Sequence, residues 1–78
     1  MDSLTIEQMI SAGMPGAEVK VSGDDGVHFE ATVISEAFEG QGTLQRHRMV
    51  YATLGAAMGH EIHALGLTTL TPAEHTQL

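Results

Sequence analysis

Histidines are the residues of this chain best suited to metal binding or proton transfer, and there are five of them. His60 and His63 form a His-x-x-His pair beside Glu61, a spacing that would suit zinc if both lay on one helix face. Gly59 and the strand pattern that follows it oppose this geometry, and a stable zinc site needs about three or four ligands. Adventitious metal binding is therefore the stronger interpretation of the pair.

The other histidine patterns favour ordinary structural roles when spacing alone is considered. His63 shares the parity of an apolar run, which is typical of a half-buried histidine that bonds a local carbonyl. His47 falls between Leu44 and Tyr51 on one helical stripe, which predicts a buried histidine without a chemical role. The same stripe includes Leu54 and Met58 and is flanked by Val50 and Ala57. His28 lies on the polar face of a predicted strand, which predicts an exposed side chain.

The composition excludes several kinds of chemistry. The 78 residues include no cysteine, so the chain cannot form a disulfide, offer a thiol nucleophile or hold an iron–sulfur cluster alone. Three basic and ten acidic residues give a net charge of −7, which opposes generic binding to nucleic acid or anionic membranes. We find no nucleophile with a nearby base, no paired carboxylates and no phosphate loop, so catalysis is not expected.

The elements that must position these residues follow from the apolar pattern. Thr5 and Gln8 fit the capping box of a short helix that ends near Gly13. Residues 17–21 and 27–34 alternate apolar and polar side chains, as the two strands of a half-buried hairpin do, and turn-forming residues join them. No apolar run approaches the roughly 20 residues of a membrane span, and the start lacks a signal peptide, so a cytoplasmic location is expected.

The second half predicts a long helix, a third strand and the start of another helix. Thr43 is a plausible N-cap for a helix that runs to Met58, with Gly59 as its C-cap. Residues 62–70 read as a strand, and Thr71-Pro72-Ala73-Glu74 is a strong helix start. We therefore expect one α+β domain over residues 1–78, a sandwich of a three-stranded mixed sheet with helices on one face.

Four motifs in this order resemble the BolA family, and the segment from Asp25 to Phe29 is similar to its IbaG-type branch. The motifs are Phe38-Glu39-Gly40, Arg46-His47-Arg48-Met49-Val50-Tyr51, Ile62-His63-Ala64-Leu65 and Thr69-Leu70-Thr71-Pro72-Ala73-Glu74. The resemblance implies a class II KH-like sandwich with the order α-β-β-α-β and a short last helix.

The resemblance also implies a non-enzymatic adaptor that binds a monothiol glutaredoxin. The two proteins would share a [2Fe–2S] cluster, with thiolates from the glutaredoxin and glutathione and with His63 as the ligand from this chain. Relatives often carry a second ligand between the first two strands, where His28 or Asp25 would have to substitute. The role implied is iron–sulfur trafficking or iron regulation.

The alternative function is a KH-like, nucleic-acid-binding transcriptional regulator. Its support lies in Arg46 and Arg48, two of the three basic residues, which could contact a phosphate, glutathione or an acidic partner, or could remain solvated beside a helix. KH domains clamp nucleic acid with a Gly-x-x-Gly loop between helices. The two such strings here, at 13–16 and 23–26, read as turns instead.

Overall fold

The computed structural model describes residues 1–23 and 25–77. The elements follow one another as α1 (Ser3–Gly13), β1 (Glu18–Ser22), β2 (His28–Ile34), the 3-10 helix η1 (Glu36–Phe38), α2 (Thr43–Leu54), the 3-10 helix η2 (Gly55–Ala57), β3 (Ala64–Leu70) and α3 (Pro72–Thr76). The turn expected between the first two strands includes Asp24, which lies outside the described residues.

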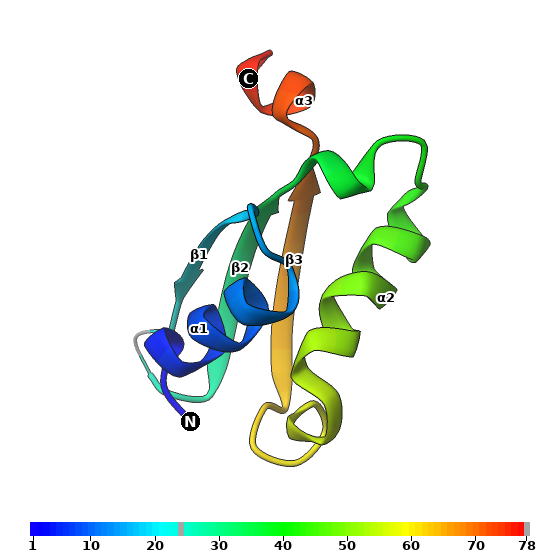
Figure 1. Ribbon diagram of the computed structural model, residues 1–78. Coiled ribbons are helices and arrows are strands. Elements are labelled where there is room, and N and C mark those ends of the chain that lie inside the picture. The colour runs from blue at the N-terminus through cyan, green and yellow to red at the C-terminus, as the bar shows by residue number, and fades with distance from the viewer. Residues whose placement is uncertain (24, 78) are drawn as a thin grey trace.

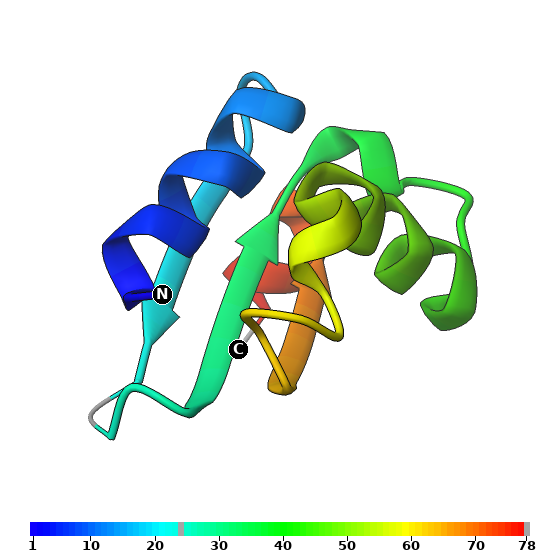
Figure 2. The same ribbon diagram turned by 90° about the horizontal axis from the view of Figure 1, so that it is seen from below.

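The three strands form one sheet in the order β1-β2-β3. β1 pairs antiparallel with β2, and β2 pairs parallel with β3, because α2 carries the chain back before the third strand begins. Figures 1 and 2 show α1 and α2 on the same side of this sheet, and α3 beyond one end of it. The expected α+β sandwich with a mixed sheet is confirmed, and its element order is compatible with a class II KH-like arrangement.

The core lies between the sheet and the two longer helices. Alternate residues of β2 face it, as the sequence pattern predicts, and the side chains with no exposed area include Ile6, Ile10, Val33, Phe38, Val50 and Ile62. These residues come from helices, strands and the two connecting segments alike. Burial of this apolar surface is the main force that holds the small domain together.

The expected start of α1 at a Thr5 capping box is wrong. Asp2 is the N-cap, and its carboxylate accepts a hydrogen bond of 2.8 Å from the backbone N–H of Thr5. Aspartate is among the preferred N-cap residues, so the helix begins one turn earlier than the box predicts. Gly13 ends the helix as expected and also lets α2 approach, because a Cβ atom there would lie 2.6 Å from a methyl carbon of Thr53.

The expected ends of α2 are also wrong. Gly42, rather than Thr43, is the N-cap, and the helix ends at Leu54 instead of Met58. Gly55 follows with φ +54°, a backbone conformation that residues with a Cβ atom rarely adopt. The 3-10 helix η2 then takes the place of the last predicted turn of the α-helix.

The buried face of α2 agrees with the predicted apolar stripe only in part. Leu54 is buried as expected, but Leu44 is 64% exposed and Tyr51 is 36% exposed. Val50, predicted to flank the stripe, is fully buried. His47, predicted to be buried, is half-buried and meets the Tyr51 ring edge-on at a centroid distance of 6.4 Å. α2 packs against α1 at Thr53, and Val50, one turn before Thr53, is buried on the same side of the helix.

Candidate functional site

His63 lies on a hydrogen-bonded loop immediately before β3, and its side chain is exposed. The expected strand begins two residues late, because Ile62 instead forms an isolated bridge with Met58. Hydrogen bonds tie the loop together, from the Gly59 N–H to the Ile62 carbonyl at 2.8 Å and from the Ile62 N–H to the Ala57 carbonyl at 2.9 Å. The Ile62 side chain is fully buried and anchors the loop in the core, whereas the next residue, His63, lies at the surface.

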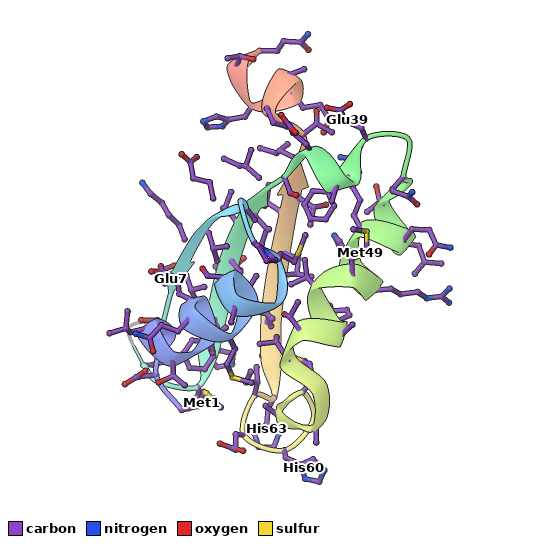
Figure 3. All side chains as sticks on the ribbon, in the orientation of Figure 1. Met1, Glu7, Glu39, Met49, His60 and His63 are labelled. Atoms are coloured by element: carbon purple, nitrogen blue, oxygen red, sulfur yellow. The ribbon has the colours of Figure 1, made fainter. Side chains whose placement is uncertain are left out.

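The His63 ring is available to a ligand from outside the chain. Among residues 1–23 and 25–77, no hydrogen bond involves this ring, and no three His, Asp or Glu side chains gather where they could hold a metal ion. The half-buried role that spacing alone favoured is therefore wrong. His60 is exposed on the same loop, and Figure 3 shows the two histidines at one end of the molecule with Glu39 at the other.

His28 is the first residue of β2, and its side chain is 74% exposed, as the sequence predicts. Its Nδ1 atom lies 2.7 Å from Oδ2 of Asp25. The other oxygen of Asp25 accepts the backbone N–H groups of Val27 and His28. These hydrogen bonds hold the pKa of the Asp25 carboxyl well below its usual range. The bond with the His28 ring has the largest effect, and the bonds from the two backbone N–H groups come next.

The hydrogen bond to Asp25 leaves Nε2 of His28 as the nitrogen that faces solvent. A carboxylate that accepts the proton of one ring nitrogen fixes the tautomer and presents the other nitrogen as a ligand. The parallel register places His28 opposite Ala64, the residue after His63. Both histidines therefore lie at the same end of the sheet, while Asp25 acts as the group that orients His28.

Arg46 is committed to contacts within the fold. Its side chain is 13% exposed, and its two terminal nitrogens meet the Glu74 carboxylate at 2.6 and 3.2 Å. The guanidinium also donates to the backbone carbonyls of Gln41 and Thr69 and lies 5.8 Å from the centroid of the Phe38 ring. No local sequence pattern indicates this pairing, because the two residues are 28 positions apart.

Of the two arginines considered for partner contact, Arg48 is the exposed one. It lies on α2 near the exposed side chains of Leu44 and Tyr51.

No helix within the described part of the chain is long and apolar enough to cross a membrane.

The Arg46–Glu74 pair predicts an acid-sensitive attachment of α3. Two hydrogen bonds lower the pKa of Glu74 from 4.5 to about 2. The bond from the Arg46 side chain has the larger effect, and the bond from the backbone N–H of Thr71 the smaller one. A lowered folded-state pKa stabilises the fold above the unfolded-state pKa, and the contribution disappears as the pH falls from about 4.5 toward 2. We expect Glu74→Gln to lower the melting temperature at pH 7 and to flatten its decline over this window.

Circular dichroism melts at a series of pH values would measure this effect. Glu61→Gln is the matched control, because Glu61 is exposed on the loop at the opposite end of the molecule. If the acid limb of Glu74→Gln ran parallel to that of the control, the pair would not be the source of the acid sensitivity.

The comparisons with known proteins agree with this architecture. The model of the BolA-like protein family matches residues 4–74. The solved structure of a bolA protein homologue from Coxiella burnetii has a TM-score of 0.87 and 45% identity, and the match covers 97% of each chain.

Two curated proteins are similar to part of this chain. Human BolA-like protein 1 is 47% identical over 47 residues, which cover 60% of this chain and 34% of the human protein. The DNA-binding transcriptional regulator BolA of Escherichia coli is 43% identical over 47 residues, 60% of this chain and 45% of the regulator. The chain thus spans between about a third and a half of the length of these relatives. Because the family model extends over nearly all of the sequence, the chain belongs to the family of BolA-like proteins.

Proposed function

We propose that this chain is a non-enzymatic cytoplasmic adaptor that binds a monothiol glutaredoxin and completes a shared [2Fe–2S] cluster. In this proposal, the glutaredoxin and glutathione supply thiolates and His63 supplies an imidazole. The observation that carries it is the exposed His63 ring, which lies on a hydrogen-bonded loop and has no hydrogen-bond partner in the described part of the chain. The adaptor would serve iron–sulfur trafficking or iron regulation.

The donor set of the chain fits one part of such a site. Imidazole is an established ligand of [2Fe–2S] clusters, but the remaining ligands are usually thiolates. The sequence has no cysteine, so every thiolate must come from another molecule. An exposed imidazole on a fixed loop can meet a partner without a large rearrangement of this chain, which lowers the ordering cost of binding.

His28 is the proposed second ligand from this chain. Its support is the position at the same end of the sheet as His63 and the Asp25 carboxylate that directs Nε2 toward solvent. Loss of Asp25 would free the ring to rotate and to change its tautomer. Asp25→Asn is therefore expected to weaken a contribution from His28 without removing the imidazole itself.

The test is a titration of the protein with cluster-loaded monothiol glutaredoxin and glutathione. We expect visible absorption and circular dichroism to change on mixing, because a new ligand alters the electronic environment of the iron. His63→Ala is expected to abolish the change. His60→Ala, which removes an exposed histidine three residues away on the same loop, is expected to leave it intact.

Two results would contradict the ligand assignment. One is an unaltered spectral change with His63→Ala, and the other is an equal loss with His60→Ala, which would indicate disruption of the loop. His28→Ala and Asp25→Asn, measured beside them, separate the two proposed ligands. A spectrum that is unaffected by His28→Ala would remove His28 from the site.

A nucleic-acid-binding regulator is the second candidate function. The name of the Escherichia coli relative and the exposed Arg48 favour it. The net charge of −7 and the commitment of Arg46 to Glu74 oppose it. Fluorescence anisotropy with labelled duplex DNA at two salt concentrations tests this function, since phosphate contacts weaken as salt rises. Absence of binding at low salt would exclude it, and Arg48→Ala identifies the contact if binding is seen.

A further inference from the structure

A groove with a volume of about 730 Å³ lies at the end of the sheet opposite the His63 loop. Its lining residues come from the turn between α1 and β1, from the segment that runs from the end of β2 into η1, and from α3. Its apolar lining consists mainly of Pro15, Ala17, Ile34, Ala37 and Pro72. The volume falls within the roughly 300–1,000 Å³ that is usual for ligand sites.

The charged lining of this groove is acidic. Glu18 begins β1 and Glu36 begins η1, and both side chains are exposed. Glu18 pairs across the hairpin with Ile34, two residues before Glu36, so an acidic residue from each of two elements lines the groove. Among the described lining residues there is no lysine or arginine, and His75 on α3 is the only other ionisable group.

We propose that this groove binds a lysine- or arginine-containing segment of a partner protein. Lysine and arginine combine an apolar stem with a cationic head, and such side chains bury the stem while the head remains at a polar rim. The apolar lining suits the stem, and Glu18 and Glu36 suit the head. The acidic net charge of −7 adds a longer-range attraction for a basic partner.

The α3 wall of the groove is fixed by contacts already described. Glu74 on this helix bonds Arg46 of α2, and its carboxylate also accepts the backbone N–H of Thr71 in the capping box. These contacts hold Pro72 and His75 beside the ends of β1 and β2. The proposed binding site is therefore preformed, and it lies too far along the sheet to share residues with the His63 loop.

Binding of a fluorescein-labelled hexa-arginine peptide to the full chain tests the proposal. The decisive variant is Glu18→Gln with Glu36→Gln. Its matched control is Glu39→Gln with Glu61→Gln, which changes the net charge equally at exposed positions outside the groove lining. We expect the groove variant to weaken binding about tenfold and the control about twofold or less, as loss of two partly solvated ion pairs implies.

Amide chemical-shift mapping with the unlabelled peptide supplies the location. We expect the largest shifts at Ala17, Ile34 and His75. Equal weakening by both double variants would overturn the proposal, because it would show attraction by net charge alone. Absence of binding to the unsubstituted chain at low salt, or shifts centred on the His63 loop, would overturn it as well. None of these results tests cluster binding, so the proposal for the groove and the proposal for His63 can be contradicted independently of each other.

Discussion

Replacing Phe38 with alanine is expected to lower the free energy of unfolding by about 3–5 kcal/mol. The Phe38 side chain has no exposed area, although it comes from the short helix η1 and not from a long element. Its removal leaves a cavity and also takes away the ring beneath the Arg46 guanidinium. A domain of 78 residues has a total stability of roughly 4–12 kcal/mol, so this loss takes away between about a quarter and all of it.

Urea denaturation followed by far-ultraviolet circular dichroism would measure the loss. Tyr51→Ala removes another aromatic side chain, but one that is 36% exposed, so a much smaller effect is expected. Phe38→Leu fills most of the space and should fall between the two. A loss for Phe38→Ala no larger than that for Tyr51→Ala would show that η1 does not anchor the core.

Replacing Ile62 with alanine is expected to cost about 2–5 kcal/mol. Ile62 has no exposed area and is the buried anchor of the loop that presents His63. The same change is therefore expected to loosen the loop while leaving the imidazole in the sequence. Thermal melts give the stability, and hydrogen exchange of the Gly59 and Ile62 amides reports the loop, because both N–H groups are bonded within it.

Ile62→Val is the conservative control, with an expected cost of about 0.5–1.5 kcal/mol and near-normal amide protection. Stability close to that of the unsubstituted chain for Ile62→Ala would mean that the loop does not depend on this anchor. Unchanged protection of both amides in Ile62→Ala would lead to the same conclusion by a second route.

Much of the fold could be predicted because its signals are local. The hairpin follows from strict alternation, as in β2, where every second residue from Phe29 to Val33 is buried. The start of α3 was equally clear, and both hydrogen bonds of the predicted capping box between Thr71 and Glu74 are present. Elements defined by such short-range contacts can be predicted from their own residues, without reference to the rest of the chain.

The errors arose where distant contacts decide the outcome. The face that α2 buries depends on α1, whose Gly13 allows close approach at Thr53. The role of Arg46 depends on Glu74, which reaches it only after β3 has returned across the sheet. No periodicity within α2 contains either relationship, and so the predicted stripe includes Leu44 and Tyr51, which are exposed, and has the fully buried Val50 only at its flank.

The candidate site was only partly predictable for the same reason. Spacing alone placed His63 among half-buried residues, whereas the bridge between Met58 and Ile62 turns the chain so that its ring reaches solvent. The alternation around His28 correctly predicted its exposure, but not the orienting bond from Asp25. The assignment of His63 as a cluster ligand came from the family resemblance and stays a prediction.

The pairing of β2 with both other strands has a consequence for the order of folding. Contact between β1 and β2 closes a connection of five residues, 23–27, whereas contact between β2 and β3 closes 29 residues, 35–63. In a flexible chain, the longer closure costs about 1.5 kcal/mol more in entropy. The β1–β2 hairpin is therefore expected to form before β3, the strand that follows the His63 loop, joins the sheet.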